Sequence, residues 1–214
     1  MLYKLKKLWR REATSAAVSL SAIRESFEAS AADEEHFPST IDPRIYHVQM
    51  IQRYFGDMSR GVALDAGCGK GRFARVLLEQ NPGLRVVTLD LALAMLRATP
   101  EESMPVCATL TRFPLRDACC DFVYATESLE HAVDIDAAVA ELCRVLKPGG
   151  RLVIIDKNAE HWGKLKTPEW EKWFDRKALE RMLRKHCGHV ESDFISYWED
   201  VEPDGMFLAW RAIK

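Results

Sequence analysis

The chain has 214 residues, of which 48% are hydrophobic and 29% are charged, and this composition is typical of one ordinary folded domain. A chain of this length buries roughly 70% of the surface that its unfolded form exposes, so it needs neither disulfides nor a metal to fold. The formal net charge of −2 provides no general attraction to polyanions. We therefore expect no nucleic-acid partner.

The first residues combine basic and hydrophobic side chains. Hydrophobic residues recur there at helical spacing, at Leu2, Leu5, Leu8 and Trp9. Residues 1–11 are thus expected to form a basic amphipathic helix, which either folds over a ligand site as a lid or makes weak peripheral contact with an anionic membrane. Serines dilute the Ala-rich stretch 13–23, so we do not interpret it as a signal peptide, whereas a mitochondrial transit peptide stays open. No run of 18 apolar residues exists, which excludes a spanning helix.

We expect residues 1–60 to form a helical cap that belongs to the same domain as residues 61–214. Polar residues 30–35 and two prolines, Pro38 and Pro43, interrupt this cap before a helix at 45–55. From Gly61 the pattern changes to short apolar runs that alternate with helical stretches. The strands expected from these runs are 62–65, 85–90, 121–125 and 151–156, and the helices are 73–79, 91–98, 136–146 and 175–186. This alternation predicts an α/β fold with a doubly wound, mostly parallel sheet.

The C-terminal part of the chain shows turn signals. Residues 147–150 are expected to form a turn before the strand 151–156, and Gly188 is expected to end the last helix in a left-handed conformation. The expected strands 190–199 and 206–213 flank the turn sequence 202–205. The sheet should therefore end in an antiparallel hairpin.

A glycine-rich loop follows the first expected strand. Asp65 ends that strand, and glycine then occupies alternate positions before a helix, at Gly67, Gly69 and Gly71. Glycines let a backbone approach a ligand closely, and a helix N-terminus offers unpaired N–H groups. Asp90 ends the next strand, where a carboxylate can accept both hydroxyls of an adenosine ribose. The loop and Asp90 together favour an adenosine cofactor over a turn without a ligand.

Two residues bear on which cofactor binds. Arg72 stands where the dinucleotide fingerprint requires a third glycine. Asp65 suits a positively charged cofactor better than a pyrophosphate. S-adenosylmethionine carries a sulfonium and an ammonium group, so it is favoured over NAD, and an NAD-dependent oxidoreductase is the less favoured interpretation.

At this point the chain resembles the class I S-adenosylmethionine-dependent methyltransferases, particularly the small-molecule branch typified by ubiquinone and menaquinone biosynthesis methyltransferases. The motifs that carry the resemblance are Leu64–Gly71, Asp90, Arg112–Leu115 with Cys120–Val123, Leu129–His131 and Glu141–Gly150. The resemblance implies a Rossmann-like seven-stranded sheet of order 3-2-1-4-5-7-6. It also implies that Cys119 is a surface thiol and Cys120 a buried one, as opposed to a metal site.

The same resemblance implies which residues bind S-adenosylmethionine. Asp65 and the backbone of Gly67, Cys68 and Gly69 would face its methionine end, and Asp90 its ribose. Leu91 would contact one side of the adenine, and Thr109 and Leu110 the other, with Glu127 beside the cofactor. Thr109 departs from the family, which usually has an aspartate there, and a hydroxyl accepts the adenine amino group less strongly than a carboxylate does.

Methyl transfer from a sulfonium requires alignment of the reacting atoms and exclusion of water, so a base is optional. If the acceptor must lose a proton, His131 is the best-placed base, and the alternative is a structural role for this residue. Residues 159–174 follow the fifth strand of the implied sheet, where this fold usually has its substrate lid. The tryptophans and lysines of that segment would suit a flat or anionic small molecule, although packing against the sheet edge explains them equally well.

We therefore predict an enzyme that transfers a methyl group from S-adenosylmethionine to an O, N, S or C atom of a small molecule, leaving S-adenosylhomocysteine. The alternative is a catalytically silent S-adenosylmethionine-binding module that acts as an assembly or regulatory partner. The cysteines contain no C-x-x-C pair and no array with zinc spacing, so we expect no metal. This pattern is typical of free thiols in a reducing compartment and predicts a cytoplasmic location.

Overall fold

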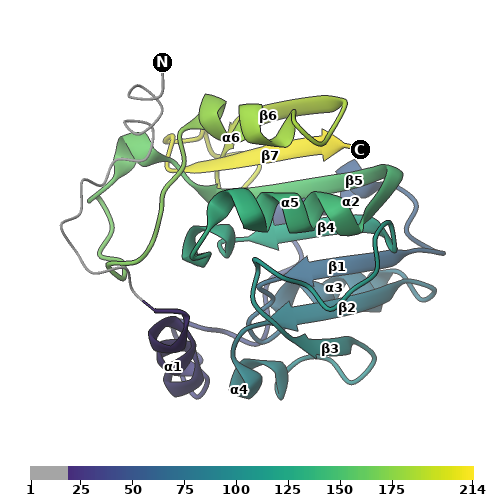
Figure 1. The fold of residues 1–214 in the computed structure, drawn as a ribbon, viewed down its shortest axis with the longest axis horizontal. Coiled ribbons are helices and arrows are strands. Elements are labelled where there is room, and N and C mark those ends of the chain that lie inside the picture. The colour runs from purple at the N-terminus through teal and green to yellow at the C-terminus, as the bar shows by residue number, and fades with distance from the viewer. Residues whose placement is uncertain (1–18) are drawn as a thin grey trace.

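A seven-stranded sheet with helices on both faces forms the centre of the computed structural model, which describes residues 19–214 (Figure 1). Its strands are β1 (Val62–Ala66), β2 (Arg85–Asp90), β3 (Met104–Cys107), β4 (Cys120–Thr126), β5 (Leu146–Lys157), β6 (His189–Ile195) and β7 (Phe207–Ile213). The helices are α1 (Leu20–Ser30), α2 (Tyr46–Phe55), α3 (Arg72–Gln80), α4 (Leu93–Leu96), α5 (Ile135–Val145) and α6 (Arg176–Leu183). Two short 3₁₀ helices, η2 (Leu129–His131) and η3 (Ala159–His161), follow β4 and β5.

The strand order is β3-β2-β1-β4-β5-β7-β6, which confirms the expected order. Strands β1 to β5 pair in parallel with their neighbours, whereas β7 runs antiparallel to both β5 and β6. The expected antiparallel C-terminal hairpin is therefore confirmed. Because the first five strands are parallel, their carboxyl ends lie along one edge of the sheet, where ligands bind in open α/β folds.

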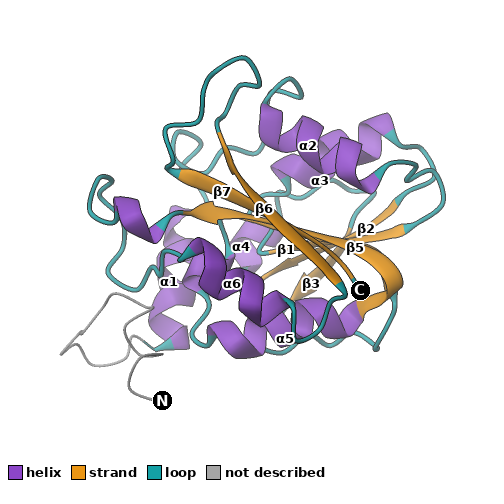
Figure 2. Ribbon diagram, turned by 90° about the horizontal axis from the view of Figure 1, so that it is seen from above, coloured by secondary structure: helices purple, strands orange, loops and turns teal. Residues whose placement is uncertain are grey.

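Two helical layers cover the sheet (Figure 2). Helices α2 and α3 pack on one face, where Ile51, Phe55 and Leu77 are buried against β4 and β5 side chains. Helices α5 and α6 pack on the other face around Leu142 and Leu179. Near the carboxyl edge of the sheet, α1 contacts α4 (Figure 1).

Three local expectations for the C-terminal half are wrong. The predicted turn 147–150 lies within β5. Pairing with β4 skips from Leu146 to Arg151, and Gly149 and Gly150 bond to the backbone of Lys214 instead. The last helix ends at Leu183 instead of residue 186, since the backbone N–H groups of residues 186 and 187 both bond to the Leu183 carbonyl in a closing turn. Gly188 has no positive φ, because its N–H already donates to Ile213 and the chain there enters the sheet.

The predicted basic helix at residues 1–11 lies outside the described residues. Among residues 19–214, no helix is long and apolar enough to cross a membrane. The cysteines are unpaired thiols, and Cys120 is buried while Cys119 is half-buried.

Candidate active site

A cavity of about 290 Å³ opens at the carboxyl edge of the sheet. The loops that follow β1, β2, β3 and β4 form one part of its wall. Helix α1, residues 36–38, Lys157 and three residues of the segment 159–174 form the rest. The fold thus brings together residues as far apart in the sequence as Leu20 and Glu171.

The first two glycines of the glycine-rich loop are needed for different reasons. Gly67 and Gly69 both have positive φ, +75° and +54°. A Cβ on Gly67 would stand 2.4 Å from the Cβ of Ser128, so close packing within the protein requires this glycine. A Cβ on Gly69 would meet no atom within 4 Å, because this residue lines the cavity. Gly69 therefore leaves room for a ligand, whereas Gly67 leaves room for Ser128.

Two backbone amides orient the carboxylate of Asp90. The N–H of Gly69 donates to Oδ2 at 2.8 Å, and the N–H of Ala92 donates to Oδ1 at 2.9 Å. Burial raises the pKa of Asp90 above its usual value. The carboxylate lines the cavity with the predicted adenine-contacting residues Leu91, Thr109 and Leu110. The fixed carboxylate retains lone pairs for hydroxyl donors from a ligand.

Asp65 does not reach the cavity wall. It is 1% exposed, and its carboxyl group interacts with the Tyr124 hydroxyl. Burial raises the pKa of this carboxyl group to about 7. The structure therefore does not bring the Asp65 side chain to the surface of the cavity, where the sequence placed it beside the cofactor.

Glu127 lines the cavity with a strained backbone, at φ +51°. Its N–H donates to the carbonyl of Ile155 at 2.8 Å. Its Oε1 atom lies 3.4 Å from the Arg72 guanidinium and accepts from the Tyr197 hydroxyl at 3.3 Å. Arg72, at the position where a dinucleotide site requires glycine, thus holds a predicted cofactor residue in place.

His131 lines the cavity, and its Nδ1 atom accepts a hydrogen bond. Trp170 donates its indole N–H to Nδ1 at 3.2 Å, so the neutral ring carries its proton on Nε2, which lies 3.6 Å from Glu130. Burial, with the nearby ammonium groups of Lys157 and Lys172, lowers the pKa of His131 to about 3. An imidazole in this state is a poor proton acceptor and is suited to hydrogen bonding.

Sequence reasoning missed a buried group of charges beside His131, which we call the acid cluster. It consists of Glu130, Asp156 and Glu171 around Lys157. The Lys157 ammonium pairs with Glu130 Oε1 and lies 3.6 Å from Glu171 Oε2. The charged pair at positions 156 and 157, directly after an apolar strand, was the signal in the sequence that could have revealed it.

The segment 159–174 contributes Pro168, Trp170 and Glu171 to the cavity wall. Trp162 instead packs edge-on against Trp173, with ring centroids 5.3 Å apart. The lysines of the segment 159–174 do not line the cavity. Lys164 and Lys166 are exposed, and Lys172 donates to the carbonyls of Ala132 and Val133. Of the tryptophans and lysines in this segment, only Trp170 lines the cavity.

Comparison with known proteins places the chain in a family. Residues 64–154 match the family model described as a methyltransferase domain. The chain is 28% identical over 149 residues to malonyl-[acyl-carrier protein] O-methyltransferase of Methylovorus sp., covering 64% of this chain and 50% of that protein. It is 34% identical over 170 residues to the protein of the same name from Pseudescherichia vulneris, covering 74% of this chain and 65% of that protein. The chain thus spans between half and two thirds of the length of these relatives.

The fold matches a solved structure over nearly its whole length. That structure is 1,6-didemethyltoxoflavin-N1-methyltransferase of Burkholderia thailandensis, with a TM-score of 0.72, 21% identity, and coverage of 96% of this chain and 93% of that one. The family match covers the glycine-rich loop and Asp90, and the sheet order is the one that the family resemblance implies. The chain therefore belongs to the class I S-adenosylmethionine-dependent methyltransferases.

Proposed function

We propose that this protein transfers a methyl group from S-adenosylmethionine to a small-molecule acceptor. The observation that carries the proposal is a single cavity that joins the glycine-rich loop and Asp90 to the wall around His131. A donor and an acceptor bound in one cavity can react without crossing bulk water.

The residues at the glycine-rich end are suited to hold the cofactor. Asp90 would accept the ribose hydroxyls, and the backbone of Gly67, Cys68 and Gly69 would face the methionine end. The adenine would lie among the neighbouring residues Leu91, Thr109 and Leu110. Glu127 would lie beside the cofactor, fixed by Arg72. When bound, S-adenosylmethionine supplies a methyl group made electrophilic by its sulfonium.

The chain's own contribution is to orient the acceptor and to exclude water. We propose that the segment 159–174 acts as a substrate lid, because Trp170 and Glu171 from this segment line the cavity. The opposite cover is α1, whose Glu28 accepts from the N–H groups of Leu93 and Ala94 at 2.7 and 2.9 Å. His131 would position the acceptor instead of removing its proton.

Calorimetry with S-adenosylmethionine and S-adenosylhomocysteine, followed by mass spectrometry of a panel of acceptors, tests the proposal. We expect both compounds to bind and at least one acceptor to gain a methyl group. Failure of S-adenosylhomocysteine to bind would contradict the cofactor assignment. Binding of both compounds with no methylated product across amine, hydroxyl, thiol and carboxylate acceptors would instead favour a silent binding module.

A further inference from the structure

The carboxylate of Glu127 lies just after β4, at the cavity wall beside the glycine-rich loop. Its side chain is 21% exposed and lines the cavity together with Arg72. The strand order places β2 and β4 on opposite sides of β1 (Figure 1). Under the proposed function, the ribose and adenine contacts follow β2 and β3. The amino-acid part of S-adenosylmethionine is therefore the part left to face Glu127.

The backbone of Glu127 adopts a conformation that residues with a side chain rarely adopt. Its φ of +51° lies in the left-handed region that favours glycine. Conformations of this kind cost free energy and are found mostly at functional sites, where the surrounding structure holds them. Here the N–H of Glu127 is held by the Ile155 carbonyl. The strain therefore indicates that the direction of this side chain matters.

Two side chains hold the Glu127 carboxylate. The Arg72 guanidinium lies 3.4 Å from Oε1, and the Tyr197 hydroxyl donates to the same oxygen at 3.3 Å. Because both contacts are to Oε1, the other oxygen, Oε2, keeps its lone pairs for a ligand. An ion pair that served only stability would need neither the strained backbone nor a place on the cavity wall.

Tyr197 comes from the loop between β6 and β7, 70 residues after Glu127. Its carbonyl accepts from the N–H of Tyr46, the first residue of α2, at 2.8 Å. Its ring stacks on His47, with centroids 4.6 Å apart, and meets Phe207 edge-on at 5.5 Å. These contacts fix the direction in which the ring presents its hydroxyl. Tyr197 does not line the cavity itself, so any effect on a ligand must pass through Glu127.

The charge of Glu127 selects one group of the amino-acid part. A carboxylate in a partly buried wall attracts an ammonium group and repels another carboxylate. A hydrogen bond between two charged groups is roughly twice as strong as one between neutral groups, and it depends on geometry. A hydroxyl that keeps the Glu127 carboxylate in one orientation therefore favours such a bond.

We propose that Tyr197 is a positioning residue for the cofactor. It orients the Glu127 carboxylate so that Oε2 accepts an N–H from the ammonium group of S-adenosylmethionine. This inference rests on the proposed function, because it assumes that this cofactor binds in the cavity. It gives a role to a residue outside the segment 64–154 that matches the family model.

Two probes that differ only in the amino-acid part test the inference. S-adenosylhomocysteine carries this part, whereas 5′-methylthioadenosine has a methyl group in its place. Tyr197→Phe removes only the hydroxyl, and it should weaken S-adenosylhomocysteine about 5-fold while changing 5′-methylthioadenosine by less than about 2-fold. Calorimetry measures the first dissociation constant and ligand-observed NMR the second. A merely structural defect would weaken both probes alike, so equal losses, or no loss for S-adenosylhomocysteine, overturn the inference.

The matched control is Tyr54→Phe. It also removes one hydroxyl, but this hydroxyl forms no hydrogen bond within residues 19–214, and Tyr54 does not line the cavity. Both dissociation constants should stay within about 2-fold of those of the unmodified protein. A loss in this control as large as in Tyr197→Phe would show that the probes do not report on Glu127, and it would overturn the inference.

A double-mutant cycle shows whether Tyr197 acts through Glu127. Glu127→Gln should weaken S-adenosylhomocysteine at least about 10-fold. Adding Tyr197→Phe to Glu127→Gln should cause less than about 2-fold further loss, because the carboxylate that the hydroxyl orients is already gone. A further loss of about 5-fold would show that Tyr197 acts elsewhere.

The same titrations separate the two proposals. If the unmodified protein does not bind S-adenosylhomocysteine, the proposed function fails. If it binds this compound and Tyr197→Phe binds it equally well, the proposed function stands and the role of Tyr197 is disproved.

Discussion

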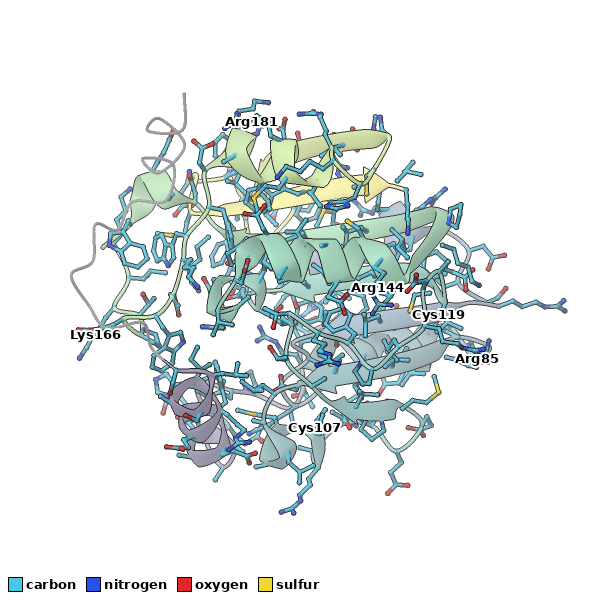
Figure 3. All side chains as sticks on the ribbon, in the orientation of Figure 1. Arg85, Cys107, Cys119, Arg144, Lys166 and Arg181 are labelled. Carbon is cyan, nitrogen blue, oxygen red and sulfur yellow. The ribbon has the colours of Figure 1, made fainter. Side chains whose placement is uncertain are left out.

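The two ends of the cavity are built in different ways. At the end formed by the glycine-rich loop and Asp90, which we call the cofactor end, the loop backbone and the amides of Gly69 and Ala92 fix the site, so short stretches of sequence define it. The other end is lined by Phe27, Glu130, His131, Trp170 and Glu171, and we call it the acceptor end because we propose that the methyl acceptor binds there. Side chains from α1, η2, β5 and residues 168–171 hold one another there through ion pairs and ring contacts (Figure 3 shows all described side chains on the ribbon). The cofactor end therefore depends on main-chain shape, whereas the acceptor end depends on which side chains meet.

The largest change in stability is expected from a substitution of the buried Lys157 at the acceptor end. Lys157→Met should lower the free energy of unfolding by about 3–5 kcal/mol, because it leaves the buried carboxyl groups of Glu130 and Glu171 without their ammonium partner. Urea unfolding measures this value. Lys166→Met, at an exposed position of the same region, should stay within about 0.5 kcal/mol of the unmodified protein. Similar values for the two variants would show that the acid cluster does not need Lys157.

At the cofactor end, Asp90→Ala should weaken S-adenosylhomocysteine binding about 100-fold. It removes an acceptor for the ribose and leaves the N–H groups of Gly69 and Ala92 without their bond. Thr109→Ala removes one hydroxyl and should weaken binding by only about 5-fold. Calorimetric titration compares the two, and equal losses would disprove the ribose assignment.

The two glycines should respond differently to alanine. Gly67→Ala forces a Cβ against Ser128 and should cost about 2–3 kcal/mol of stability, because overpacking and positive φ both act against it. Gly69→Ala should lower the free energy of unfolding by only about 1 kcal/mol, the cost of the positive φ. It should weaken the binding of S-adenosylhomocysteine, because the new Cβ enters the cavity. Thermal unfolding and titration measure both properties. An unchanged affinity in Gly69→Ala would mean that this loop does not contact the cofactor.

A smaller effect should appear in the pH dependence of stability. His131 stays neutral in the folded protein down to its lowered pKa of about 3, whereas the unfolded chain binds a proton near pH 6.5. The unfolded state therefore binds more protons below that pH, and this residue should reduce stability by about 2 kcal/mol at pH 5 relative to neutral pH. His131→Gln should lose correspondingly less over the same range. Parallel curves for the two proteins would show that His131 is not protected from protonation.

The sequence offers more local signals for the cofactor end than for the acceptor end, and the reason is physical. The residues from Gly67 to Gly69 and Asp90 act through backbone conformation and strand ends, which local patterns specify. Residues that act through distant partners gave no such pattern. The sequence left His131 open as a base or a structural residue, and only the structure shows that Trp170 donates to its Nδ1 atom. Asp65 was placed correctly at the end of its strand, but local sequence could not show that it lies behind the cavity wall.

By itself, the sequence determined the α/β alternation and, through the motifs that resemble a family, the strand order, because apolar periodicity and turn residues are encoded in neighbouring positions. Only the tertiary structure decided that β5 runs through the glycines at 149 and 150, since their backbone groups bond to the backbone of Lys214 at the far end of the chain. Tertiary structure also decided the charge of the acceptor end. Glu130, Lys157 and Glu171 read as ordinary charged residues along the chain, and their chemistry arises because folding buries them together.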